Sequence, residues 1–262
     1  MQKIRSQDGS EIAFERLGSG PPVIVVGGAF SDHRARAAGL PLGRELESRM
    51  TVFCYDRRGR GESTATEPYA VAREIEDLAA LLAIAGGSAH VYGHSSGAIL
   101  ALEAALAGLA LERLALYEPP LVLGDLRERM PPDLPEQLVA LTLAHQPSAA
   151  AELFLTRGVG VPAPAVQQMK RGPAWPGLEA AAHSLSADAR LTADPESILV
   201  RAAALRTETL LLSGGKSQPW MLSGVEKLAA AIPAVRRGAL PEQAHDVEPR
   251  ALAPKLLEFF LA

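Results

Sequence analysis

The sequence predicts an α/β fold with a mostly parallel central sheet flanked by helices and one helical insertion. Three observations predict it. Short apolar runs rich in β-branched or aromatic residues, such as residues 23–26 and 52–55, are typical of strands buried on both faces of a sheet. Between such runs the apolar residues take helical spacing, as over residues 71–84, so strands alternate with helices. This alternation stops after residue 118 and resumes near residue 200.

The predicted sheet draws its strands from both ends of the chain. Residues 12–17 alternate only loosely between apolar and polar types, which is typical of an early edge strand. Strands are expected at residues 12–17, 23–26, 52–55, 90–92, 113–117, 209–212 and 235–240, and helices at 71–84, 98–107, 223–231 and 249–261.

The stretch between the two halves carries no strand signal. Pro and Gly residues separate short helical segments there, at 136–143, 149–155, 164–170 and 177–185. A helical insertion between two halves of one sheet explains this pattern. We therefore expect a core built from residues 1–118 and 200–262, and a helical cap built from residues 119–199.

Composition argues against several classes of protein. The formal net charge of −4 gives no electrostatic reason to expect a nucleic-acid or membrane partner. No stretch approaches the ~20 apolar residues of a membrane-spanning helix, and the N-terminus lacks the apolar segment of a secretory signal. We therefore expect a cytoplasmic protein. The single cysteine, Cys54, lies in a predicted buried strand and cannot form an internal disulfide.

Residues 93–97 read G-H-S-S-G and fit the pattern G-x-S-x-G. A short apolar strand precedes them and an alanine-rich helix follows, which is the context of a nucleophile elbow. A sharp turn leaves no room for a Cβ atom on either side, so both glycines have a physical reason. Ser95 would then lie at the helix N-terminus, whose partial positive charge favours a developing anion. The alternative is an ordinary helix N-cap.

With this motif in place, the chain resembles the α/β-hydrolase superfamily nearly from end to end. Residues 56–63, D-R-R-G-R-G-E-S, look like that family's D-x-R-G-x-G-x-S loop, and residues 244–246, A-H-D, look like its histidine loop. The helical insertion matches the family's cap, inserted after the sixth strand. Residues 117–120, Y-E-P-P, and 174–177, A-W-P-G, are similar to those of small cap-bearing bacterial hydrolases of actinobacterial type. The resemblance implies a serine hydrolase acting on a small molecule without a metal ion or cofactor.

A serine nucleophile needs an adjacent base and an acid that orients the base. Among six histidines, only His245 combines a loop after the last strand with the chain order that this fold requires. The family's usual acid follows the seventh strand, but residues 212–219 carry no carboxylate. Glu118 ends the strand after the nucleophile helix, as in certain haloalkane dehalogenases and the zearalenone lactonases, so we expect it to be the acid. Asp246 is the other candidate, better suited to bracing its loop.

Acyl transfer also needs backbone N–H groups that stabilise the oxyanion. The expected donors are Ser96, which follows the nucleophile, and Ala29, in the loop after the strand at 23–26. Phe30 and, from the cap, Trp175 are expected to border the substrate.

The predicted reaction is hydrolysis of a carboxylic ester or lactone through an acyl-enzyme. A serine at the elbow argues against epoxide hydrolase and dehalogenase chemistry, which in this fold use an aspartate there. Two alternatives stay open. A hydrolase of carbon–carbon bonds uses the same Ser/His pair, and a binding or biosynthetic accessory protein keeps the fold without catalysis.

Overall fold

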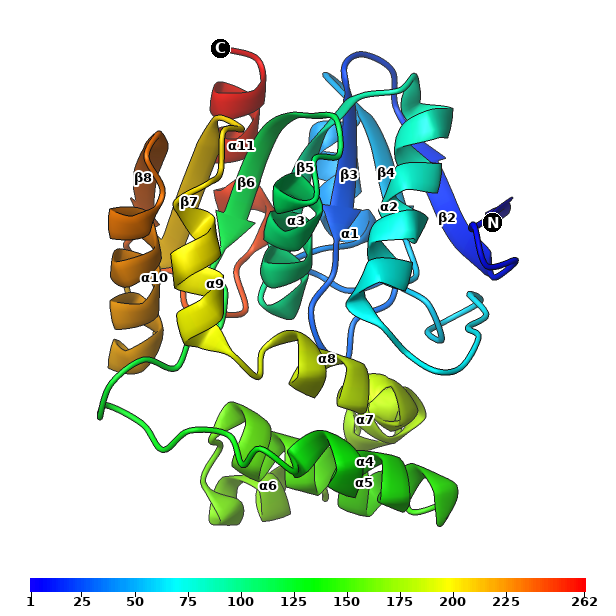
Figure 1. The fold of residues 1–262 in the computed structure, drawn as a ribbon, viewed down its shortest axis with the longest axis vertical. Coiled ribbons are helices and arrows are strands. Elements are labelled where there is room, and N and C mark those ends of the chain that lie inside the picture. The colour runs from blue at the N-terminus through cyan, green and yellow to red at the C-terminus, as the bar shows by residue number, and fades with distance from the viewer.

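The computed structural model describes residues 1–262 and contains one eight-stranded sheet (Figure 1). The strand order is β1-β2-β4-β3-β5-β6-β7-β8; β1 and β2 run antiparallel to their neighbours and the other pairs are parallel. The strands are β1 (Gln2–Arg5), β2 (Glu11–Leu17), β3 (Pro22–Val26), β4 (Thr51–Tyr55), β5 (Ala89–His94), β6 (Leu111–Tyr117), β7 (Thr209–Gly214) and β8 (Val235–Leu240).

All seven predicted strands are present, but the prediction of an edge strand at residues 12–17 is wrong. β2 lies between β1 and β4, and β1 takes the edge. The sequence gives little sign of β1, because its four residues, Q-K-I-R, contain one apolar side chain.

Helices cover both faces of the sheet (Figure 1). Successive side chains of β3 divide between these faces: Val23 and Val25 pack into one apolar cluster, Ile24 and Val26 into the other. This division explains the continuous apolar run. No helix is long and apolar enough to cross a membrane. One face is covered by α1 (Leu40–Leu46) and α11 (Pro249–Phe260), the other by α2 (Val71–Ala85), α3 (Ser96–Leu106), α9 (Pro195–Ala202) and α10 (Pro219–Ala231).

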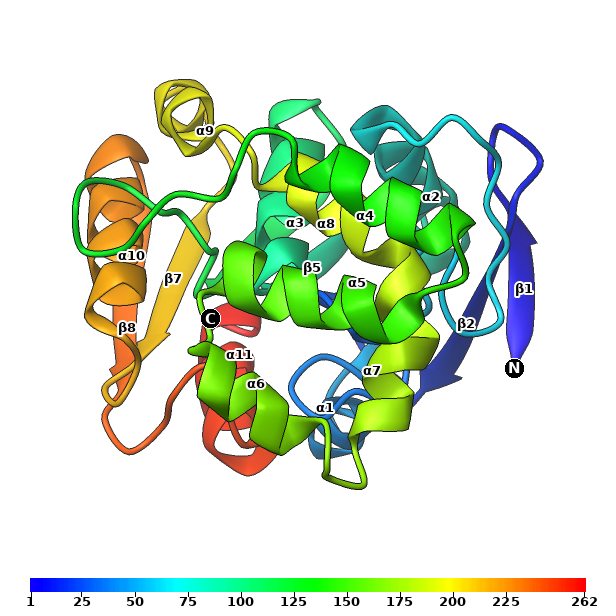
Figure 2. The same cartoon turned by 90° about the horizontal axis from the view of Figure 1, so that it is seen from below.

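A layer of short helices lies across the carboxyl ends of the strands (Figures 1 and 2). We call residues 134–191 the helical layer; it has an apolar cluster of its own, separate from the two that flank the sheet. Three helices, α1, α8 (Leu185–Leu191) and α9, were not predicted. The predicted core boundary at 199/200 falls inside α9, whose buried residues pack with the sheet. The layer contains α4 (Leu134–Leu143), α5 (Pro147–Leu153), a π-helical turn (Phe154–Val159), α6 (Ala163–Met169), α7 (Trp175–Ala181), a 3₁₀ turn (Ala182–Ser184) and α8 (Leu185–Leu191).

Candidate active site

Ser95 lies in the turn between β5 and α3, with φ 57° and ψ −127°. This conformation is sparsely populated for a residue with a side chain. Close packing maintains it: a Cβ atom on Gly93 would lie 2.5 Å from the Gly97 carbonyl oxygen, and one on Gly97 would lie 2.4 Å from the Val26 carbonyl oxygen. The two glycines therefore permit the turn that places Ser95 at the start of α3.

The structure brings Ser95, His245 and Glu118 into one hydrogen-bonded chain. His245 Nε2 lies 3.0 Å from Ser95 Oγ, and His245 Nδ1 lies 2.8 Å from Glu118 Oε2. Because a carboxylate only accepts hydrogen bonds, Nδ1–H is the donor and Nε2 is free to accept the serine proton. Three separate strand ends supply these groups: Ser95 follows β5, Glu118 follows β6 and His245 follows β8.

Glu118 is fully buried at the end of β6. Burial alone would raise the pKa of its carboxyl, but the hydrogen bonds from His245 and from the Gly214 backbone N–H hold that pKa below its ordinary value. The Gly214 nitrogen lies 2.7 Å from Glu118 Oε1. The carboxylate therefore stays ionised. The end of β7, where the usual acid is missing, contributes a backbone N–H donor to the Glu118 carboxylate instead.

Two aromatic side chains hold the loop that carries His245. The half-buried His94 ring lies 4.9 Å from the His245 ring, and His94 Nε2 is 2.8 Å from the His245 carbonyl oxygen. Burial, together with the neighbouring His245, lowers the pKa of His94 to about 4. His94 is thus neutral near pH 7 and donates from Nε2. The Tyr117 hydroxyl donates to the Ala244 carbonyl at 2.7 Å. No sequence pattern indicates this role for Tyr117.

The predicted oxyanion donors flank Ser95. A Cβ atom on Gly28 would lie 2.8 Å from Ser95 Cβ, so the loop after β3 contacts the nucleophile directly. The Ala29 N–H donates to no acceptor within the protein. Ser96 is the first residue of α3, so its N–H has no intrahelical acceptor. Both residues line the cavity beside Ser95.

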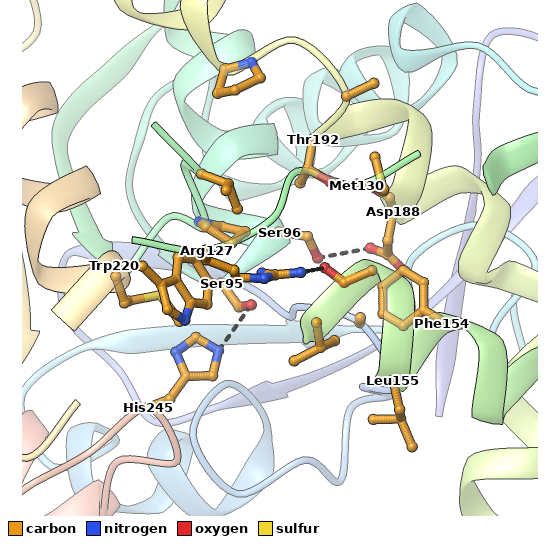
Figure 3. A pocket seen from close by; sticks show the side chains of 18 of the residues that line it. Ser95, Ser96, Arg127, Met130, Phe154, Leu155, Asp188, Thr192, Trp220 and His245 are labelled. Atoms are coloured by element: carbon orange, nitrogen blue, oxygen red, sulfur yellow. Dashed lines mark hydrogen bonds between the residues drawn. The ribbon is translucent and has the colours of Figure 1, made fainter. Parts of the chain in front are cut away.

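Asp188, which sequence reasoning missed, links the helical layer to this site. The carboxylate comes from α8 and is buried; its Oδ1 accepts from the Ser96 hydroxyl at 2.7 Å (Figure 3). It also pairs with Arg57 at 2.8 Å and with Arg60 at 2.6 Å. The one available signal was position: Asp188 falls on the same helical face as Leu185 and Leu191, where an acid is out of place unless it is paired.

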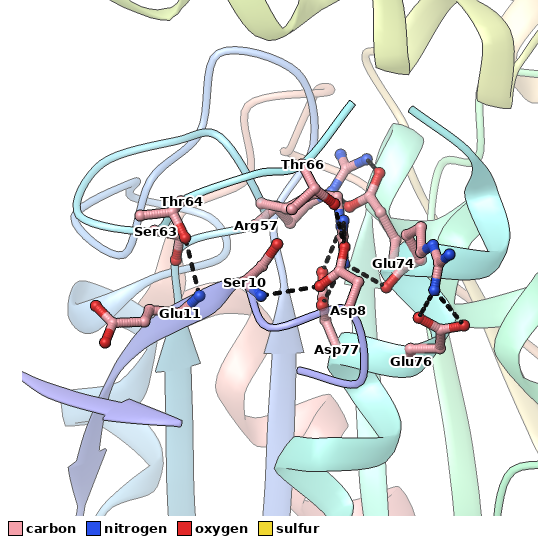
Figure 4. A network of polar contacts seen from close by, with 12 residues as sticks. Asp8, Ser10, Glu11, Arg57, Ser63, Thr64, Thr66, Glu74, Glu76 and Asp77 are labelled. Atoms are coloured by element: carbon pink, nitrogen blue, oxygen red, sulfur yellow. Dashed lines mark hydrogen bonds and ion pairs between the residues drawn. The ribbon is translucent and has the colours of Figure 1, made fainter. Parts of the chain in front are cut away.

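The same two arginines fix the backbone beneath Ala29. Arg60 donates to the Gly28 carbonyl at 2.6 Å, and Arg57 donates to the Gly27 carbonyl at 3.3 Å. Arg57 also binds both carboxylate oxygens of Glu74, in the polar network drawn in Figure 4. Two buried cations thus face two buried carboxylates, Glu74 and Asp188. The arginine-rich loop at residues 56–63 therefore has a structural role, joining the segment before Ala29 to α2 and α8.

We expect Asp188→Ala to lower the free energy of unfolding by about 3–5 kcal/mol, because it leaves two buried arginine charges without their shared partner. Urea-induced unfolding measures the change. The matched control is Glu136→Ala, which removes the partner of Arg190 in a more exposed ion pair between α4 and α8. Glu136→Ala should lower the free energy of unfolding by less than about 1 kcal/mol. Equal losses in the two variants would contradict this interpretation.

A cavity of about 280 Å³ opens over Ser95 and His245 (Figure 3). Phe30 lines it and packs edge-to-face against Phe154, with ring centroids 5.6 Å apart. The expectation for Trp175 is not met. Trp175 is buried inside the helical layer instead of lining the cavity, because its Nε1–H is bound within the layer, by Ser148 and Glu179.

Comparisons with known proteins agree with this fold. The model of the Alpha/beta hydrolase family matches residues 23–253, and the chain belongs to this family. A solved α/β hydrolase from Sphaerobacter thermophilus is 49% identical over 99% of this chain and 100% of its own, with a TM-score of 0.92. A hydrolase from Pseudomonas aeruginosa is 25% identical over 100% and 98% of the chains, with a TM-score of 0.77.

A curated relative matches a shorter stretch. The uncharacterised hydrolase YraK of Bacillus subtilis is 36% identical over 101 residues, which is 36% of this chain and 35% of that protein. These findings confirm the predicted fold class and the superfamily resemblance. The narrower resemblance to actinobacterial-type hydrolases stays a prediction.

Proposed function

We propose that this hydrolase cleaves a carboxylic ester or lactone through an acyl-enzyme formed on Ser95. One observation carries the proposal: Glu118, His245 and Ser95 form a continuous hydrogen-bonded chain at the floor of a largely apolar cavity. A base within hydrogen-bond reach of a serine, itself oriented by a third group, is the arrangement that activates a weak nucleophile.

The proposed reaction has two halves. Ser95 Oγ attacks the carbonyl carbon while His245 Nε2 takes the hydroxyl proton, and the Ala29 and Ser96 N–H groups stabilise the oxyanion. The ester C–O bond then breaks, and His245 returns the proton to the leaving oxygen. Water, deprotonated by His245, next attacks the acyl-enzyme; the product acid leaves and Ser95 recovers its proton. Glu118 holds the His245 tautomer and stabilises the imidazolium throughout.

We further propose that residues 119–199 act as the cap of this site. Three contacts support the proposal. Phe154 and Leu155, from the helical layer, line the cavity, and Asp188 ties α8 to Ser96. Residues 1–118 and 200–262 would then supply the catalytic core.

A serine-directed fluorophosphonate probe tests the proposed function. We expect the probe to label Ser95, with the site mapped by mass spectrometry, and we expect no labelling in Ser95→Ala. A screen of aryl esters and lactones of graded acyl size should then identify hydrolysed substrates. If the probe leaves Ser95 unmodified and no ester or lactone is cleaved, the proposed function is wrong. That outcome would favour the non-catalytic binding protein, whereas labelling of Ser95 without cleavage of any ester or lactone would favour the carbon–carbon bond hydrolase.

A further inference from the structure

We propose that Arg127 makes the cavity selective for substrates that carry a carboxylate away from the bond to be cleaved. The inference rests on the proposed function, because it names the class of ester or lactone that the site accepts. Arg127 lies in the segment that leads from β6 to α4, and it lines the same cavity as Ser95 and His245 (Figure 3).

The charge balance of the cavity singles out Arg127. Asp188 is neutralised by its two arginines, and the other cavity-lining arginine, Arg129, pairs with Glu196. Arg127 has no carboxylate within 4.0 Å, and its burial lowers the pKa of the guanidinium with no nearby anion to offset the effect. A half-buried cation without a partner is unfavourable. A carboxylate on the substrate would supply that partner.

The Arg127 guanidinium is also held in place before any ligand arrives. Its Nη2 donates to the Gly158 carbonyl at 2.5 Å, and its Cζ lies 4.7 Å from the centroid of the Trp220 ring. Nε and Nη1 have no acceptor in the protein, so those donors remain for a ligand. A planar guanidinium with free N–H groups is well suited to a carboxylate.

A purely structural role for Arg127 makes a different prediction. Through Nη2 the side chain also contacts the Arg157 carbonyl at 3.5 Å, near the end of the π-helical turn. If Arg127 only stabilised that turn, its removal would slow neutral and anionic substrates by the same factor. The ratio of kcat/KM for the anionic substrate to kcat/KM for the neutral substrate therefore distinguishes anion recognition from structural support.

The test compares two series of p-nitrophenyl esters with one leaving group. The anionic series contains the mono-esters of succinate, glutarate and adipate; the neutral series contains the butyrate, valerate and hexanoate. We expect the kcat/KM ratio of anionic to neutral ester to exceed one for at least one chain length. Arg127→Gln should lower that ratio about tenfold to a hundredfold, because it removes a charged hydrogen bond. Arg127→Lys should recover part of the loss.

Arg129→Gln is the matched control, because Arg129 lines the cavity but has its own carboxylate partner. We expect it to leave the ratio within about twofold of the wild type. If neutral esters are cleaved but the ratio is one or less and Arg127→Gln does not change it, the inference is overturned while the proposed function stands.

A binding measurement distinguishes the anion site from the proposed function if no ester of either series is cleaved. Trp220 lies against Arg127, so glutarate binding should change tryptophan fluorescence in the Ser95→Ala variant, and methyl valerate should change it less. Loss of the glutarate response in Ser95→Ala/Arg127→Gln would support the anion site even though the proposed function had failed. If glutarate causes no fluorescence change, or if the change persists in Arg127→Gln, the inference about Arg127 is overturned.

Discussion

Ser95→Ala should lower kcat by about 10⁴-fold or more, because the attacking oxygen is lost while the cavity and the oxyanion donors remain. Hydrolysis of the best ester from the screen measures the loss. The fold should be unchanged, because alanine is smaller than serine and the Ser95 hydroxyl forms its hydrogen bond only with His245. Circular dichroism and the thermal midpoint check this point.

Ser96→Ala is the matched control for that experiment. It removes the hydroxyl that donates to Asp188 but keeps the backbone N–H that faces the cavity. We expect Ser96→Ala to lower kcat by about tenfold or less, because it removes only one supporting hydrogen bond. If Ser95→Ala keeps wild-type activity, or if the Ser96 variant loses as much as the Ser95 variant, Ser95 is not the nucleophile.

Glu118→Gln should lower kcat by roughly 10²–10⁴-fold with little change in fold. The amide can donate to Nδ1 as well as accept from it, so the imidazole loses its enforced tautomer and the imidazolium loses a buried counter-charge. Steady-state kinetics on the same ester measures the change. The structure also offers a rescue, because Ser217 lies beside the Glu118 carboxylate. Ser217→Asp in the Glu118→Gln background should restore part of the activity.

Asp246→Asn is the comparison that tests the choice of acid. Asp246 is exposed and pairs with Arg36, away from the chain that joins Ser95 to Glu118. We expect Asp246→Asn to lower kcat by about tenfold or less, because Asp246 only braces the loop that carries His245. Abolished activity in Asp246→Asn, together with near wild-type activity in Glu118→Gln, would show that the acid is Asp246.

The sequence predicted the fold class and the three residues of the hydrogen-bonded chain because each leaves a local signal. Ser95 is bracketed by the glycines that its turn requires, and His245 and Glu118 each follow a recognisable strand. The three residues then lie close together because β5, β6, β7 and β8 are consecutive parallel strands whose carboxyl ends meet at one edge of the sheet.

The residues that sequence reasoning missed act through contacts with no local pattern. Ser96 and Asp188 are 92 positions apart and meet only because α8 packs over the start of α3. Arg127 stands in an irregular segment, where neither periodicity nor a motif marks a charged side chain. The expectation for Trp175 failed for a related reason: a large apolar residue in a helical insertion serves equally well in the interior of the insertion or against a substrate, and sequence spacing does not distinguish the two.

The link between Asp188 and Ser96 has a consequence for how substrate reaches the site. If α8 swung away from the sheet, Arg57 and Arg60 would lose their shared counter-ion, and the segment under Ala29 would lose part of its support. The proposed oxyanion donors thus depend in part on the packing of α8 against the sheet. We therefore expect α8 to keep its place when substrate binds, because its movement would also disturb the segment that carries Ala29.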